Sequence, residues 1–109
     1  SLGKTVIISI QQNNPYNDCD KVAINIPNEI DFKVFYEESI AIGLESKCVY
    51  ELKSVVHHHG RLNNGHYTSN INICDNWYEF DDSLVYKYID GISYTSSSAY
   101  ILFYTKSSL

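Results

Sequence analysis

The sequence of 109 residues predicts an α+β fold that is dominated by strands and built around an antiparallel sheet. Ten Tyr, four Phe and one Trp accompany many Ile and Val, the residue types that favour strands. Short apolar or alternating runs are separated by turns rich in Asn, Asp, Gly and Pro. At this length we expect one domain, because the chain is too short for two separate cores.

Six stretches have the pattern of strands, and the last of them, the continuous apolar run AYILFYT, is expected to lie inside the sheet. They are Thr5–Ile10, Val22–Ile26, Tyr50–His59, Gly65–Ile73, Trp77–Asp82 and Ala99–Thr105. Loops are expected at QQNNPYNDCD, at Gly60–Asn64 and at the serine-rich run Gly91–Ser98. The stretch Asn28–Lys47 has mixed periodicity, which fits a short helix or an extended loop equally well. The aromatics expected in the core are Trp77, Tyr78, Phe80 and those of Tyr100–Tyr104.

Composition excludes several classes of partner. The net charge of −5 and the absence of a Lys/Arg run argue against nucleic acid, which needs a basic stripe. No apolar run of membrane-spanning length and no signal-peptide pattern occur. Three cysteines without a CxxC pair favour a reducing compartment, cytoplasmic or nuclear. Because the chain begins at Ser1 rather than Met, we expect it to be a piece of a longer protein.

The hairpin after Gly65 can be registered from its side-chain pattern, since a slip of one residue would exchange the two faces of a strand. Matching apolar residues places Ile71 opposite Tyr78. Asp81 then shares the polar face of His66 as its diagonal neighbour, roughly 7–8 Å away between backbones. A shifted register would bring Asp82 to that face instead, with poorer apolar matching. The pattern therefore favours Asp81.

A histidine beside an aspartate on an adjacent strand is the orienting half of a catalytic triad. We expect the carboxylate of Asp81 to hold Nδ1–H of His66 and to leave Nε2 free for the proton of a nucleophile. If that nucleophile is a cysteine, the imidazolium also stabilises its thiolate. From residue types alone, a surface cross-strand pair with no catalytic role is the favoured interpretation, because structural charge pairs also resemble active sites.

Several motifs in order decide between these interpretations. The segments YELKSVVHHHGRLNNGHYTSNI, WYEFDDSLV and AYILFY resemble the histidine box of the ubiquitin-specific proteases, the ubiquitin carboxyl-terminal hydrolases. The resemblance is strongest over Tyr50–Val85 and Ala99–Tyr104, and TVIISIQQ and VAINIPNEIDF match more loosely. It implies that the sheet is part of a papain-like cysteine protease fold, its "palm" half. Residues 1–109 would be one partial domain, the C-terminal portion of the catalytic domain.

The resemblance also implies roles for the residues of the GHY and FDD motifs. His66 matches the general base and Asp81 the residue that orients it. Asp82 matches a position that assists the site or supports the oxyanion. The implied reaction is hydrolysis of the bond after the C-terminal glycine of ubiquitin, so ubiquitin or a ubiquitinated protein is the implied partner.

Three further positions match the channel that receives the Gly-Gly tail of ubiquitin. Gly65 and Tyr67 match positions that line this channel, and a glycine there would let a second backbone pass closely. His58 matches the recurrent histidine of the V-V-x-H-x-G motif and is the candidate for contact with the tail. These three residues are therefore the predicted substrate-binding set.

The departures from the family pattern are as informative. The cysteine box is missing, and none of Cys19, Cys48 and Cys74 has its surroundings. The zinc-binding CxxC pairs of the family are missing too, so we expect no metal and no cofactor. The expected nucleophile lies on the missing N-terminal half of the catalytic domain, and without it this chain should be inactive.

Alternatives to this interpretation remain. His57 and His59 share a strand face and could form a zinc pair, although polar residues at a strand end are the favoured interpretation because no fourth ligand is suitably spaced. The chain could instead be a catalytically degenerate module that binds ubiquitin or serves as a scaffold. A papain-like protease acting on another ubiquitin-like tail is a weaker possibility.

Overall fold

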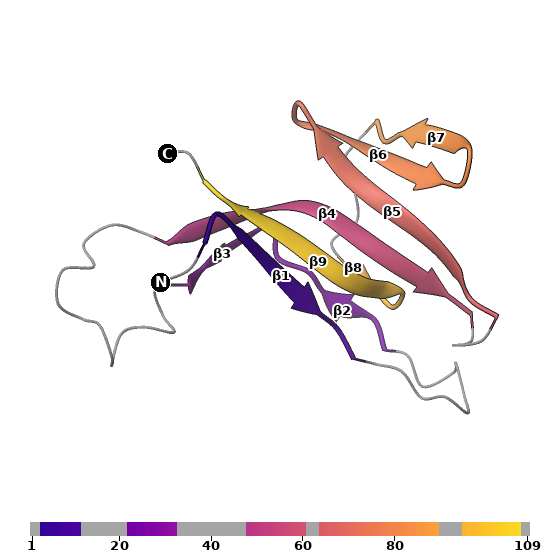
Figure 1. The fold of residues 1–109 in the computed structure, drawn as a ribbon, viewed down its shortest axis with the longest axis horizontal. Coiled ribbons are helices and arrows are strands. Elements are labelled where there is room, and N and C mark those ends of the chain that lie inside the picture. Colours follow the sequence, from indigo (N-terminus) through magenta and orange to yellow (C-terminus); the bar gives the residue numbers. More distant parts are fainter. Residues whose placement is uncertain (1–2, 12–21, 33–47, 61–63, 90–94, 108–109) are drawn as a thin grey trace, which may run out of the picture.

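The fold is a seven-stranded antiparallel sheet with a small two-stranded sheet beside it (Figure 1). The computed structural model describes residues 3–11, 22–32, 48–60, 64–89 and 95–107. The strands of the large sheet are β1 (Thr5–Ser9), β3 (Glu29–Asp31), β4 (Val49–His59), β5 (His66–Ile73), β6 (Asn76–Asp81), β7 (Leu84–Lys87) and β9 (Ala99–Lys106). Their order is β1-β9-β4-β5-β6-β7, with β3 paired to β4, and β2 (Ile24–Asn25) pairs with β8 (Thr95–Ser96). The predicted strand-dominated antiparallel fold is confirmed.

Five of the six expected strands form nearly as predicted, and the apolar β9 lies between β1 and β4 as expected. The expected strand Val22–Ile26 is reduced to the two residues of β2. Strands β3, β7 and β8 were not predicted, because two to four residues are too few for a periodicity to show. Within the described ranges there is no helix that could cross a membrane.

Parts of the predicted loops fall outside the described residues. This holds for 12–20, 61–63 and 91–94. In the ambiguous stretch Asn28–Lys47, the described part begins with β3, and 33–47 also lie outside the described residues. The end of the expected serine-rich loop is strand β8, whose Thr95 hydroxyl donates a hydrogen bond to Oδ1 of Asn25 at 3.0 Å. Side-chain pairing with β2 thus orders a segment whose composition indicates a loop.

The β5–β6 hairpin has the predicted register. Ile71 pairs with Tyr78, as apolar matching requires. The two-residue turn consists of Cys74 and Asp75, both with positive φ (51° and 65°). Positive φ at both central residues is the geometry of a type I′ turn, which matches the twist of the two strands. The turn and the apolar pattern therefore specify the same pairing.

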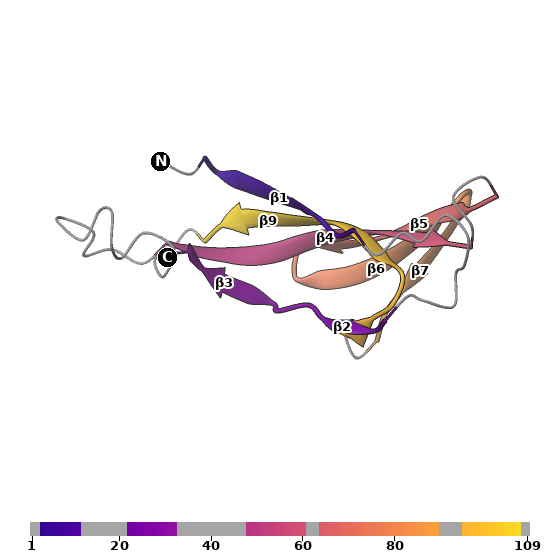
Figure 2. The ribbon, with the colours of Figure 1, turned by 90° about the horizontal axis from the view of Figure 1, so that it is seen from below.

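One face of the large sheet carries the hydrophobic core. Figure 2 shows the small sheet of β2 and β8 lying on one side of the large sheet, which it covers in part. The buried apolar residues gather there: Ile26, Tyr50, Leu52, Val55, Trp77, Ala99, Leu102 and Tyr104. Trp77 and Tyr104 are the predicted core aromatics that the structure confirms, at 6% and 0% exposure.

The opposite face is also apolar but is not part of this core. The ladder registers align two rows of side chains across the sheet, from β1 to β7. These rows contain Ile7, Phe103, Ile71 and Tyr78 in one and Ile101, Val56, Phe80 and Val85 in the other. We call them the open face. Tyr78 and Phe80, predicted as core aromatics, lie here because the pleat alternates them with the buried Trp77. Ile7 and Val85 are more than half exposed, at 62% and 55%.

Candidate active site

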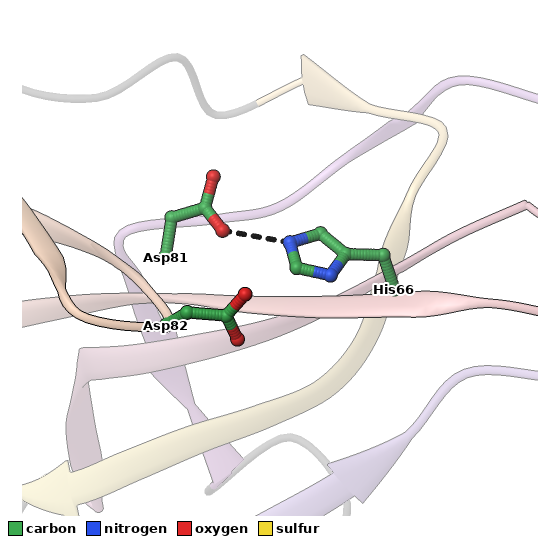
Figure 3. Close-up of side chains that lie close together, drawn as sticks. All are labelled: His66, Asp81 and Asp82. Atoms are coloured by element: carbon green, nitrogen blue, oxygen red, sulfur yellow. Dashed lines mark hydrogen bonds and ion pairs between the residues drawn. The ribbon is translucent and has the colours of Figure 1, made fainter.

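His66 and Asp81 lie side by side at the ends of neighbouring strands (Figure 3). His66 is the first residue of β5 and Asp81 the last of β6. The Nε2 of His66 and Oδ1 of Asp81 are 2.7 Å apart, a short hydrogen bond or ion pair. Both side chains remain accessible, at 48% and 36% exposure. The predicted choice of Asp81 over Asp82 as the direct partner of His66 is confirmed.

The orientation of the His66 ring differs from the expected one. The prediction that Nδ1 faces Asp81 is wrong, since Nε2 makes this contact. Nδ1 is therefore the ring nitrogen that remains for proton exchange with another group. The strand register fixes where the ring stands but not its rotation about χ2, so a sequence pattern cannot distinguish the two nitrogens.

Asp82 follows directly in the turn between β6 and β7. Its φ is +50°, a conformation that Asp adopts more readily than most residues. Figure 3 shows its carboxylate beside the His66–Asp81 pair. One ligand atom from each of the three side chains lies within 4.8 Å of the others. A cation placed among them would have to displace the hydrogen bond of His66, and nothing further indicates a metal here.

The two carboxylates favour the protonated form of His66. The hydrogen bond to Asp81 raises the pKa of the His66 imidazole, and the negative charges of Asp81 and then Asp82 raise it further. An imidazole that accepts a proton more readily is a better partner for an acidic thiol, because the imidazolium stabilises a thiolate. The electrostatics therefore suit a base that acts next to a cysteine.

The three predicted substrate-binding residues lie together on the other face of the sheet. His58 pairs with Tyr67 across the β4–β5 ladder, and their ring centroids are 4.8 Å apart. Tyr67 is 55% exposed, whereas His58 is only 5% exposed. Gly65 precedes β5, and a Cβ there would collide with the His58 ring. His58 thus lies below the surface, and its contact with a substrate tail stays a prediction.

A polar network lies beside the His66–Asp81 pair on the covered face. His57 donates from Nε2 to Oδ1 of Asn70 and accepts from the Ser98 hydroxyl at Nδ1, at 2.8 Å. Asn70 in turn donates to the Tyr88 hydroxyl at 3.0 Å, and that hydroxyl donates to Glu79 at 3.2 Å. These residues line a cavity of about 220 Å³. Burial lowers the pKa of His57, which keeps this ring neutral.

The predicted register of the histidine strand is confirmed, with His59 opposite His66 and His57 opposite Thr68. His57 uses both ring nitrogens in hydrogen bonds, and Nε2 of His59 lies 3.0 Å from the Thr68 hydroxyl. The two rings stack 5.9 Å apart rather than converging on a common point. The hydrogen bonds therefore account for this pair without a zinc ion.

Sequence reasoning missed the network of His57 and Asn70 and the close approach of His58 to Gly65. The network could have been inferred from the sequence, because period-two alternation places His57 and Asn70 on the same face of the sheet as His66. The contact of His58 with Gly65 could not, since a glycine that flanks a strand is consistent with several local causes.

A strand-dominated sheet that pairs a histidine with an aspartate at the ends of adjacent strands is an arrangement that a cysteine-protease domain can use. Residues 4–104 match the family model described as ubiquitin carboxyl-terminal hydrolase. The match covers most of the chain, and the chain belongs to this family.

Relatives agree with that assignment. The chain is 39% identical over 94 residues to a probable ubiquitin carboxyl-terminal hydrolase of Acanthamoeba polyphaga mimivirus, covering 83% of the chain and 19% of that protein. It is 38% identical over 78 residues to ubiquitin carboxyl-terminal hydrolase 3 of Homo sapiens, covering 71% of the chain and 15% of that protein. The chain therefore spans less than a fifth of the length of these curated relatives.

Solved structures share the fold. The Ubp8/Sgf11/Sus1/Sgf73 deubiquitinating module of the SAGA complex superposes with a TM-score of 0.77 at 23% identity, covering 99% of this chain and 24% of that chain. The same module bound to ubiquitin aldehyde superposes with a TM-score of 0.73 at 23% identity, covering 99% of this chain and 25% of that chain. Nearly the whole chain thus corresponds to about a quarter of a larger protein.

Proposed function

We propose that this chain is the histidine-and-aspartate part of a thiol-dependent deubiquitinase, which hydrolyses the bond after the C-terminal glycine of ubiquitin. The observation that carries the proposal is the contact of 2.7 Å between Nε2 of His66 and Oδ1 of Asp81. In this scheme Nδ1 of His66 takes the proton of a cysteine supplied by another segment, and Asp81 holds the ring in place. Asp82 supports the site through its charge or by assisting the oxyanion.

The remaining predicted residues would receive the substrate. Tyr67 is exposed on the same strand as His66, so it can line the channel for the tail of ubiquitin. Gly65, next to His66 and also exposed, offers backbone that a second chain could approach. Ubiquitin is the partner proposed for this surface, and the structurally similar Ubp8 module binds ubiquitin aldehyde.

The missing N-terminal half of the catalytic domain is the second proposed partner. The open face carries two rows of apolar side chains, of which Ile7 and Val85 are more than half exposed, and an apolar patch on a surface can mark a protein–protein contact. This chain covers 24% of the related Ubp8 chain, so the larger part of a comparable protein would be available to cover this face. The cysteine nucleophile would come from that part.

A reducing compartment, cytoplasmic or nuclear, is proposed for the parent protein. Among the described residues, Cys48 and Cys74 are free thiols, which persist in such compartments. A thiol nucleophile would need the same conditions to stay active.

The proposal is tested with a ubiquitin C-terminal amide as substrate. We expect no turnover by the chain alone and turnover when the cysteine-bearing half of the parent domain is added. The His66→Ala variant should abolish the restored activity, whereas His59→Ala, an equally drastic change at an exposed neighbour, should retain most of it. Turnover by the chain alone, or restored turnover that survives His66→Ala, would refute the assignment. Ubiquitin binding without turnover in the mixture would instead favour a degenerate binding module.

A further inference from the structure

We propose that His58 is a positioning residue for His66, which it locates through Gly65. The ring of His58 fills the space that a side chain at position 65 would need, and so it sets where strand β5 begins. The inference rests on the proposed role of His66 as the base, and it assigns to the buried histidine of the V-V-x-H-x-G motif a task other than touching substrate.

The contact between His58 and Gly65 is closer than any side chain at position 65 would allow. A Cβ built on Gly65 would lie 1.8 Å from Nε2 of His58 and 2.6 Å from two of its ring carbons. Atoms without a bond between them do not approach so closely. The backbone of Gly65 is not in the left-handed region that favours glycine, so space rather than conformation requires this residue.

The register explains why the two residues meet. His58 lies directly opposite Tyr67, and residue 65 is therefore its diagonal neighbour on the same face of the hairpin. Diagonal neighbours are within reach of a long or aromatic side chain. The ring of His58 leans along the ladder onto the bare Cα of Gly65.

The His58 ring has little room to move away. It is 5% exposed and is flanked by two tyrosines, with ring centroids 4.8 Å away at Tyr67 and 6.2 Å away at Tyr100. The backbone N–H of His58 donates a hydrogen bond to the carbonyl of Ser98 at 2.9 Å. The ring is thus held by its neighbours, and the β5 backbone must accommodate it.

His66 is the next residue after Gly65, and its side chain projects to the opposite face of the sheet. A shift of the backbone at Gly65 is therefore transmitted directly to the imidazole. The contact between His66 and Asp81 is 2.7 Å, and it would cease to be a hydrogen bond if the atoms moved apart by about 1 Å. A displacement of roughly 1 Å can lower a catalytic rate on the order of 100-fold.

A second explanation of Gly65 predicts a different outcome. If this residue is a glycine only so that a substrate backbone can pass, Gly65→Ala should leave the free chain unchanged. If the His58 ring requires the space, Gly65→Ala should disturb His66 without any substrate, and removing the ring should relieve the disturbance.

The experiment compares four forms of this chain, the natural sequence, Gly65→Ala, His58→Ala and the double variant. Two properties are measured by NMR without ubiquitin, the titration of the His66 imidazole and the hydrogen exchange of the β5 amides. In Gly65→Ala we expect the raised pKa of His66 to fall toward the ordinary value, and exchange at His66 to accelerate at least about tenfold. In the double variant we expect the pKa of His66 and the exchange rate at His66 to return most of the way to their values in the natural chain.

Gly60→Ala is the matched control. A Cβ at Gly60 would meet the carbonyl of Asn64 at 3.4 Å and Cα of Gly65 at 3.6 Å, with no clash against His58. Any defect of Gly60→Ala comes from its φ of +87°, so His58→Ala should not relieve it. If His58→Ala restores the Gly65→Ala variant but not the Gly60→Ala variant, the restoration is specific to the contact between His58 and position 65.

The inference is overturned if Gly65→Ala leaves the His66 titration and the β5 exchange unchanged. It is equally overturned if the double variant is as disturbed as Gly65→Ala. Should Gly65→Ala fail to fold, the double variant must fold, and its failure to do so would count against the inference. None of these measurements uses ubiquitin, so they succeed or fail independently of the proposed deubiquitinase activity.

Discussion

The hydroxyl of Tyr104 joins the sheet to the segment that covers its core. Tyr104 lies in β9, is completely buried, and donates a hydrogen bond from its hydroxyl to the carbonyl of Pro27 at 2.7 Å. Pro27 lies between β2, which packs on the covered face, and β3, which pairs with β4 in the large sheet. Tyr104→Phe keeps the ring in the core and removes only this bond, so it isolates the energy of the connection.

The expected loss of stability is that of one partly buried hydrogen bond. Such a bond contributes about 1 kcal/mol net, and because Pro27 is exposed, its carbonyl can bind water once the hydroxyl is removed. Urea unfolding can be followed by the fluorescence of Trp77, the single tryptophan, which lies in the same core. With a denaturant slope of about 1.5 kcal/mol per molar, the unfolding midpoint should fall by roughly 0.7 M.

Tyr86→Phe is the matched control, because it removes the same hydroxyl from an exposed side chain on β7. Its effect should stay within about 0.5 kcal/mol of zero. A Tyr104→Phe variant no less stable than Tyr86→Phe would show that the segment around Pro27 is not held to the sheet by this bond.

Alkaline conditions give the same hydroxyl a second test. Burial raises the pKa of Tyr104 from 10.0 to about 12. A group whose pKa is higher in the folded than in the unfolded chain contributes its full stabilisation when the pH is below its unfolded-state pKa. This contribution is lost as the pH rises through its folded-state pKa. The stability advantage of the natural chain over Tyr104→Phe should therefore hold below pH 10 and shrink between pH 10 and pH 12. An advantage that is constant through this range would contradict the burial of the ionisable hydroxyl.

The other predictions concern the candidate site and the hairpin that carries it. Asp81→Asn should lower the pKa of His66 more than Asp82→Asn does, because the hydrogen bond to Asp81 is the largest cause of the raised pKa. Equal shifts in an NMR titration of the two variants would argue against the observed pairing. Because the pKa of His66 is raised in the folded chain, its pairing with Asp81 stabilises the fold fully below pH 6.5 and less as the pH rises through the folded-state pKa of His66. The destabilisation by Asp81→Asn should therefore be largest below pH 6.5. Cys74→Asn combined with Asp75→Gly should stabilise the type I′ turn by about 0.5–1 kcal/mol, and a lower Tm would contradict that turn geometry.

The position of the acid could be predicted from the sequence because apolar matching selects one register. It placed Ile71 opposite Tyr78, and the two-residue turn that the structure shows at Cys74 and Asp75 closes the same register. A slip of one residue would have buried polar side chains on one face and exposed apolar ones on the other. The partner of His66 follows from this register, which depends on residue types along two whole strands.

The features that could not be predicted depend on contacts rather than on pattern. Which nitrogen of His66 faces Asp81 is set by rotation about a single side-chain bond, to which strand alternation is insensitive. Strand β8 is ordered by hydrogen bonds to residues 70 positions earlier in the chain, such as Asn25, and the serine run around it carries no strand signal. The glycine at position 65 is explained by a ring seven residues earlier, which becomes its neighbour only when the hairpin closes.

The two faces of the sheet explain how this chain can hold the pair of side chains in place. The covered face has its own core on the side of the small β2–β8 sheet, and the same face carries His66 and Asp81 at its edge. Assembly of the pair therefore depends on a register fixed by contacts within the chain, and it does not require the open face to be covered. Packing against the open face would add stability without having to create the pair. His66 and Asp81 should consequently be found paired in the isolated chain, and under the proposed function the nucleophile is the one chemical component that a partner must bring.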